Sequence, residues 1–243
     1  MSKTIYFIPG TMCDDRLWQP TWQLLGEQYS QDCQLVHLPI PTTGSMDEVV
    51  GELAKKIVTE NAILVGFSLG GYFASAIALK IPELISHLVV VSNMPKNLPD
   101  AEIKQRKRTI AWIAKRGYSG IPNKRIDDLL HPEIKQIEGH HFASIKNTIV
   151  AMDADLGVDV LLHQLSVSMS RPALLNGLSK LTLPISFLVG DEDSLVDLPS
   201  LEQEIIDAKN IKAFKVENTG HMLPLESPQA LASALTSLLI IQN

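Results

Sequence analysis

The sequence has few aromatic residues, few cysteines and no excess of positive charge. Only 5% of its 243 residues are aromatic, and its two cysteines, Cys13 and Cys33, cannot form a disulfide framework. The N-terminal segment lacks the charged and apolar regions of a secretory signal, so we expect a cytoplasmic protein. The net charge of −6 disfavours a nucleic-acid partner, because phosphate binding needs a surplus of Lys and Arg.

Motifs for metals and cofactors are also absent. The sequence contains no H-E-x-x-H, no paired C-x-x-C and neither of the glycine-rich nucleotide-binding patterns. Glycine and proline, 14 of each, stay near average usage, which excludes collagen-like and disordered proteins. We therefore expect a globular protein that acts on a small molecule without a metal or a cofactor.

One uncharged stretch, Ile63 to Leu79, has the length of a short membrane span. It runs for 17 residues, about the lower limit for crossing a bilayer, but it holds three glycines and two serines. A strand, a tight turn and a buried helix explain this composition better. We expect no membrane segment.

Short apolar runs alternate with amphipathic stretches along most of the chain. Ser45 with Glu48, and Ser227 before Pro228, are typical of helix starts. Such alternation predicts a mainly parallel sheet with helices on both faces. The expected strands are Thr4–Ile8, Leu35–Leu38, Ala62–Phe67, Leu88–Ser92, Ile185–Val189 and Lys212–Val216.

A basic insert interrupts the acidic body of the chain. Residues 95–180 carry 13 Lys and Arg against nine Asp and Glu, whereas the remainder carries eight against 18. Helical periodicity over 102–116 and 142–152 predicts that the insert is all helix. We expect one domain, with residues 1–94 and 181–243 as its core and 95–180 as an excursion.

The strongest chemical signal is the G-x-S-x-G pattern of residues 66–70, between an apolar strand and a small-residue helix. A serine that projects from a sharp strand-to-helix turn needs glycines beside it, because flanking Cβ atoms would collide with the neighbouring elements. Ser68 at this place is a candidate nucleophile. The helix start also directs backbone N–H groups, including that of Leu69, toward an oxyanion.

A serine nucleophile needs a base, usually a histidine that a carboxylate orients. Of seven histidines, only His221 follows a late strand in a loop, which makes it the candidate base. The acid should follow the fifth expected strand, where Asp191 and Asp193 both occur. The neighbouring residues do not show which of these two aspartates is the acid.

The chain resembles the α/β-hydrolase superfamily, in particular the lid-bearing branch with the pimeloyl-carrier-protein methyl esterases and related carboxylesterases. The resemblance implies a three-layer α/β-hydrolase fold with a helical lid at residues 95–180. It selects Asp193 as the acid and assigns the oxyanion hole to the N–H groups of Thr11 and Leu69, although Pro9 replaces the usual histidine. The usual N-terminal antiparallel edge is expected to be missing, which leaves about six strands. The matching segments are 7–14 with Leu17-Trp18, 66–71, 188–190 with Asp193, and 220–228.

These observations predict a serine hydrolase that cleaves a carboxylic ester or thioester through an acyl-enzyme. C–C bond hydrolysis or acyl transfer by the same three groups remains an alternative, and a ligand-binding sensor without turnover is a second one. The basic run Lys104–Arg108 could dock an anionic acyl carrier at the lid or form a solvated helix face. Trp112, Ile113, Phe142 and Met152 are candidate selectivity residues or simple packing residues, and Cys13 is expected to line the pocket as a small hydrophobe.

Overall fold

Six strands form one sheet in the order β2-β1-β3-β4-β5-β6, and every neighbouring pair is parallel. The computed structural model describes residues 3–29, 33–134 and 139–240. Within these residues the sheet has no antiparallel edge, and all six expected strands are confirmed. The strands are β1 (Lys3–Ile8), β2 (Cys33–His37), β3 (Ala62–Phe67), β4 (Ile85–Val91), β5 (Ile185–Gly190) and β6 (Ile211–Val216).

Both faces of the sheet are covered, which explains why its strands are continuous apolar runs. All six residues of β3 are buried. Along β1, Tyr6 and Ile8 belong to one apolar cluster, whereas Ile5 and Phe7 belong to another, as the two-residue period of a strand requires. Burying each of these large side chains stabilises the fold by about 1.5–3 kcal/mol. A sheet between two apolar clusters is the predicted three-layer architecture.

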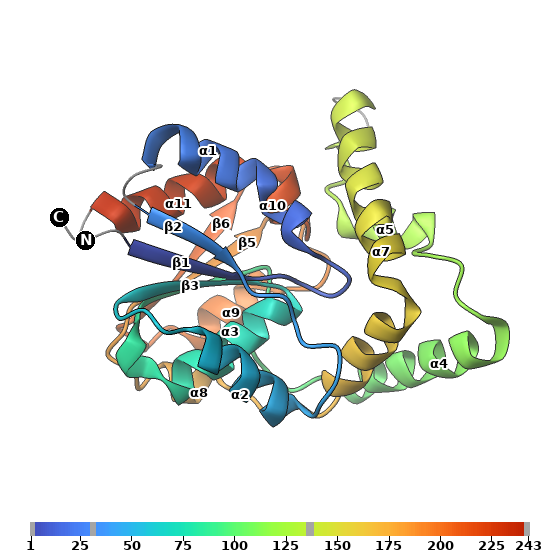
Figure 1. Cartoon of the computed structure of the whole chain (residues 1–243), viewed down its shortest axis with the longest axis horizontal. Helices are drawn as coiled ribbons and strands as arrows, with labels where there is room; N and C mark the ends of the chain where they lie inside the picture. Colours follow the sequence, from blue (N-terminus) through green and yellow to red (C-terminus); the bar gives the residue numbers. More distant parts are fainter. Residues whose placement is uncertain (1–2, 30–32, 135–138, 241–243) are drawn as a thin grey trace.

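Helices pack on both faces of this sheet (Figure 1). The capping box predicted for α2 is present, since Ser45 accepts a bond from the Glu48 N–H and the Glu48 side chain accepts one from the Ser45 N–H. Within the described residues, no helix combines the length and the apolar character that a bilayer crossing requires. One face carries α1 (Gln19–Tyr29), α10 (Leu223–Glu226) and α11 (Pro228–Ile240); the other carries α2 (Met46–Lys56), α3 (Leu69–Lys80), α8 (Leu175–Leu178) and α9 (Leu198–Glu204).

The chain between β4 and β5 forms helices that stand to one side of the sheet (Figure 1). They include α4 (Asp100–Arg116), α5 (Asn123–Leu129) and α7 (Gly139–Val167), and the two expected helices lie within α4 and α7. Gly157 has a φ of 76°, so α7 bends there and its second half takes a new direction. We keep residues 95–180 as the lid and 1–94 with 181–243 as the core, a division that stays a proposal.

Both ends of the lid join the core at one place. The Leu174 N–H donates to the Pro95 carbonyl at 2.8 Å, and the Arg171 side chain donates to the Lys96 carbonyl at 3.0 Å. The Tyr72 hydroxyl of α3 donates to the Pro172 carbonyl at 2.9 Å. The first two bonds hold the two ends of the lid together, and the third ties them to the helix that begins at the candidate nucleophile.

Candidate active site

Ser68 lies in the turn between β3 and α3 in a strained backbone conformation, with a φ of 49° and a ψ of −118°. Few residues other than glycine adopt a positive φ, so the surroundings must hold it in place. A Cβ at Gly66 would collide with the Gly70 carbonyl, and one at Gly70 would collide with the carbonyls of Ile8 and Pro9. The steric reason predicted for both glycines is therefore present in the structure.

The structure brings Ser68, His221 and Asp193 together from three distant segments. The Nε2 atom of His221 lies 3.0 Å from the Ser68 Oγ, and its Nδ1 atom lies 2.9 Å from the Asp193 Oδ1. The His221 side chain is 4% exposed and that of Asp193 is fully buried. A serine, an imidazole and a carboxylate in this order can activate the hydroxyl and transfer its proton.

The surroundings of Asp193 favour its ionised form, which pairs with His221. Burial alone would raise the pKa of Asp193, but the facing imidazole and the hydrogen bonds outweigh it and lower that pKa. The N–H groups of Leu195 and Val196 donate to Oδ1 at 2.9 and 3.2 Å and orient the carboxylate. Because an ionised carboxylate only accepts, Nδ1 of His221 carries the proton and Nε2 faces Ser68 as an acceptor.

Asp191, the alternative acid, shapes the loop before His221. It accepts bonds from the N–H groups of Asn218 and Thr219 at 3.1 and 3.0 Å. Burial opposes its charge, but these bonds lower the pKa of Asp191 below its usual value. The two aspartates that local reasoning left open thus have different contacts, and Asp193 is the one that meets the imidazole.

The loop of Gly10 and Thr11 lies directly against the nucleophile turn. A Cβ at Gly10 would come within 2.7 Å of the Phe67 ring and 3.2 Å of the Ser68 Cβ, so only glycine allows this approach. Among the hydrogen bonds recorded for the described residues, none uses the N–H of Thr11 or of Leu69 as donor. Both N–H groups therefore remain available for an anion beside Ser68.

A family model described as the alpha/beta hydrolase family matches residues 5–234. This chain is an α/β hydrolase. A curated relative from Pseudoalteromonas atlantica, "Pimeloyl-[acyl-carrier protein] methyl ester esterase", is 24% identical over 196 residues, which cover 72% of this chain and 71% of the relative. A second, from Salmonella arizonae, is "2-succinyl-6-hydroxy-2,4-cyclohexadiene-1-carboxylate synthase", 24% identical over 97% of this chain and 93% of its own.

Solved structures agree on the fold of this hydrolase. A thermophilic esterase from Thermogutta terrifontis superposes with a TM-score of 0.81 at 18% identity and covers 98% of this chain and 90% of its own. An enol-lactonase from Burkholderia xenovorans LB400 superposes with a TM-score of 0.79 at 14% identity, over 98% and 92% of the two chains. At these identities the likenesses show the fold of the chain.

The lid of the hydrolase contacts the His221 loop. The His221 N–H donates to the Leu129 carbonyl at the end of α5, at 2.8 Å. Glu226 accepts bonds from the N–H groups of His131 in the lid and of Gly220 beside the imidazole, at 2.7 and 3.1 Å. Sequence reasoning missed Glu226, although a charged residue inside the motif of residues 220–228 was a signal for it.

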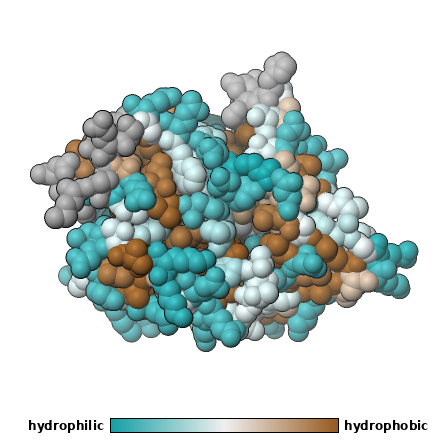
Figure 2. Space-filling view, viewed as in Figure 1, coloured by the Kyte–Doolittle hydropathy of each residue, from teal (hydrophilic) through white to brown (hydrophobic). Residues whose placement is uncertain are grey.

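The four candidate selectivity residues of the lid differ in their surroundings. Ile113 and Met152 are buried and Phe142 is partly buried, whereas Trp112 is 57% exposed. The Met152 sulfur accepts a bond from the Asp14 N–H at 3.4 Å, so this residue lies between lid and core. Figure 2 shows hydrophobic surface on the lid side of the molecule, next to hydrophilic surface.

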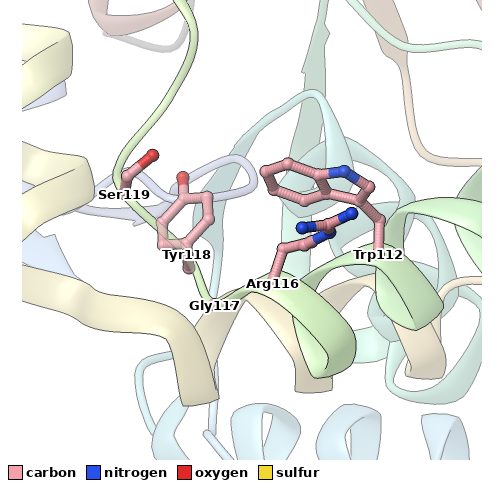
Figure 3. A pocket seen from close by; sticks show the side chains of 5 residues that line it. All are labelled: Trp112, Arg116, Gly117, Tyr118 and Ser119. Carbon is pink, nitrogen blue, oxygen red and sulfur yellow. The ribbon is translucent and has the colours of Figure 1, made fainter.

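The exposed indole of Trp112 belongs to a shallow hollow at the end of α4 (Figure 3). The hollow has a volume of about 440 Å³, and Trp112, Arg116, Gly117, Tyr118 and Ser119 line it. None of these five residues is one of the candidate catalytic groups. The hollow is therefore a feature of the outer lid rather than of the reaction site.

The basic run of α4 divides into one inward and several outward residues. Arg106 pairs with Glu102 at 2.6 Å and donates to the Ser168 hydroxyl. Lys104, Lys107 and Arg108 are exposed. These three cations, with the exposed Gln105 between them, face solvent, and the carrier dock stays a proposal.

Cys13 is a buried thiol beside the candidate site. Burial, with the nearby Asp14, raises the pKa of the Cys13 thiol to about 12, so the thiol stays protonated. Cys13 is 7% exposed and packs in the core beside the Thr11 loop.

Across residues 3–29, 33–134 and 139–240, no group of His, Cys, Asp and Glu is arranged to hold a metal ion.

Proposed function

We propose that this chain is a serine hydrolase that cleaves a carboxylic ester or thioester through an acyl-enzyme. The observation that carries the proposal is the pair of contacts of His221, with Ser68 at 3.0 Å and with Asp193 at 2.9 Å. Both distances are within the reach that proton transfer requires. The esterase relatives support the same class of reaction.

In the proposed first half-reaction, the Ser68 Oγ attacks the carbonyl carbon while its proton moves to the Nε2 of His221. The N–H groups of Thr11 and Leu69 stabilise the oxyanion. Asp193 stabilises the imidazolium, which then donates the proton to the departing alkoxide or thiolate. Removing one oxyanion donor typically lowers kcat by about 10²–10³-fold.

In the second half-reaction, His221 removes a proton from water, and the resulting hydroxide attacks the acyl-enzyme. Collapse of the tetrahedral intermediate returns the proton to the Ser68 Oγ and releases the acid. The proton thus passes through one nitrogen atom in both halves, and the Asp193 carboxylate stays ionised throughout.

The partner of the reaction is a small ester or thioester, and we extend the proposal to an acyl carrier. The name of the Pseudoalteromonas relative mentions an acyl-carrier-protein ester, and Lys104, Lys107 and Arg108 are exposed on the lid of this chain. A location in the cytoplasm, as predicted from the sequence, fits such a substrate.

The same three groups could also support C–C bond hydrolysis or acyl transfer, and the Salmonella relative is named a synthase. A sensor without turnover is the less favoured alternative, because ligand binding does not require a nucleophile, a base and an acid in hydrogen-bond contact. Product analysis with water and with added alcohols or thiols as acceptors separates hydrolysis from transfer.

A phosphonate probe tests the proposal directly. We expect a covalent adduct on Ser68 by mass spectrometry, no adduct in Ser68→Ala, and an unchanged adduct in Ser237→Ala, which removes an exposed hydroxyl from α11. An unlabelled parent protein, or labelling that survives in Ser68→Ala, would contradict the proposal.

A further inference from the structure

The segment from Gly10 to Cys13 is a tight turn. The Cys13 N–H donates to the Gly10 carbonyl at 3.2 Å, which closes the four-residue turn. Met12 has a φ of 55°, whereas Thr11 is not among the residues with positive φ. A positive φ only at the third position is the mark of a type II turn, which favours Gly or Asn there. Methionine by itself therefore favours a different orientation of the Thr11–Met12 peptide.

The turn determines where the Thr11 N–H points. The peptide between Gly10 and Thr11 is planar and trans, so its N–H and its carbonyl point in opposite directions. Because the Gly10 carbonyl faces the inside of the turn toward Cys13, the Thr11 N–H faces outward. Where this N–H lies relative to Ser68 therefore depends on how the turn as a whole is held in place.

A lid side chain holds this turn from outside. The Oε1 atom of Gln164 accepts a bond from the Met12 N–H at 2.9 Å, across 152 positions of sequence. Gln164 is 3% exposed and Met12 is 7% exposed, so water does not replace this bond readily. On the other side, the Cys13 thiol donates to the Thr11 carbonyl at 3.4 Å. The Thr11–Met12 peptide is thus held at its N–H and at its carbonyl.

Gln164 itself is fixed within the lid. The Ser168 hydroxyl donates to the Gln164 carbonyl at 2.6 Å. Arg106 of α4 donates to the same hydroxyl and pairs with Glu102. The turn of α7 that presents the amide is therefore braced by the neighbouring lid helix.

We propose that Gln164 is a positioning residue of the oxyanion hole, which keeps the Thr11 N–H aimed at the reacting carbonyl by holding the Met12 N–H. The inference rests on the proposed function, in which Thr11 is an oxyanion donor. Without the amide, the buried Met12 N–H loses its acceptor, and the lid no longer anchors the turn that carries the Thr11 N–H beside Ser68. Gln164 would then act on the transition state more than on bound substrate.

Kinetics of Gln164→Leu with a small ester test this proposal. We expect kcat to fall by about 10–100-fold with KM nearly unchanged, somewhat less than complete loss of an oxyanion donor. The rate of phosphonate labelling should fall in parallel. Gln203→Leu, which changes an exposed glutamine on α9, is the matched control and should leave both rates as they are.

A conservative variant separates positioning from packing. Gln164→Glu keeps an acceptor oxygen at the same reach and should retain most of kcat, whereas Gln164→Met keeps the length without that oxygen and should lose as much as Gln164→Leu. Should Gln164→Leu fail to fold, Gln164→Asn keeps the amide but shortens its reach and should show the same loss of kcat.

Two outcomes would overturn the inference while the proposed function stands. They are a parent-like kcat in Gln164→Leu with Ser68 still required, or a loss in Gln164→Glu as large as that in Gln164→Leu. If the parent never labels at Ser68, the proposed function and this inference both fail.

Discussion

Core and lid contribute different kinds of group to the site. The core supplies the three side chains that we propose to react, each just beyond the carboxyl end of a parallel strand, with Ser68 after β3, Asp193 after β5 and His221 after β6. The lid supplies supporting groups, namely the Gln164 amide and the Leu129 carbonyl. In the proposed enzyme, the parallel sheet determines which chemistry is possible, whereas the lid positions the groups that surround the reacting atoms.

The largest effect should follow removal of the core groups. We expect Ser68→Ala and His221→Ala each to lower kcat for a p-nitrophenyl ester by at least about 10⁴-fold, because the two groups act as one unit. Circular dichroism and the thermal midpoint show whether the fold is kept. If either variant retains substantial turnover, the core does not hold the reactive groups.

The strained backbone at Ser68 predicts a difference in stability between two inactive variants. Glycine tolerates the positive φ of this position better than alanine does. Ser68→Gly should therefore unfold at a higher denaturant concentration than Ser68→Ala, by about 1 kcal/mol in the free energy of unfolding, although both are inactive. Equal stabilities would mean that the turn is not strained in solution.

Much of the core arrangement could be predicted from the sequence, because its causes are local. Gly66 is required by the Gly70 carbonyl four residues further on, and the apolar runs identify the strands, although Gly70 itself is required by the distant carbonyls of Ile8 and Pro9. The residues next to Asp191 and Asp193 in the sequence do not show which of them contacts the imidazole. That contact depends on the loop in which Leu195 and Val196 turn their N–H groups back onto one carboxylate, and only the family resemblance selected Asp193.

The lid contacts could not be predicted in the same way. Gln164 contacts Met12 because α7 bends at Gly157 and packs over the turn. No local sequence pattern predicts either the bend or the packing. A glutamine within the apolar end of α7 was the one available hint. Long-range contacts of this kind depend on tertiary packing, which periodicity does not encode.

A matched pair of glycine-to-alanine substitutions compares how well the core and the lid accommodate an added Cβ. Gly70→Ala places a Cβ against the carbonyls of Ile8 and Pro9, so we expect a loss of about 3 kcal/mol or more in the free energy of unfolding. Gly157→Ala in the lid meets no atom within 4 Å, and its cost of about 1–2 kcal/mol comes from the φ of 76° alone. Urea unfolding measures both, and a reversed order would contradict the close packing around Gly70.

The pH dependence of the unfolding free energy tests the hydrogen bonds that Asp191 accepts in the loop before His221. The folded pKa of Asp191 lies below its unfolded value, so its contribution to stability is full above the unfolded value near pH 4. That contribution is lost as the pH falls through the folded pKa. Asp191→Asn should flatten the dependence of the unfolding free energy on pH below about 4, by about 1 kcal/mol or less because the group is partly solvated. An unchanged pH profile would show that its bonds to residues 218 and 219 contribute nothing.

The smallest effect on the protein itself should come from the outer surface of the lid. Changing Lys104, Lys107 and Arg108 to glutamine should alter the unfolding free energy by less than about 0.5 kcal/mol and leave turnover of a small ester unchanged, because these side chains are exposed. With an acyl-carrier-linked ester, the same variant should lose about tenfold in kcat/KM, and the loss should shrink as salt screens the charges. Glutamine at Lys55, Lys209 and Lys212 removes three exposed charges from the core and serves as the control. If both triple variants behave alike with the carrier substrate, the lid has no docking role and its basic run is a solvated helix face.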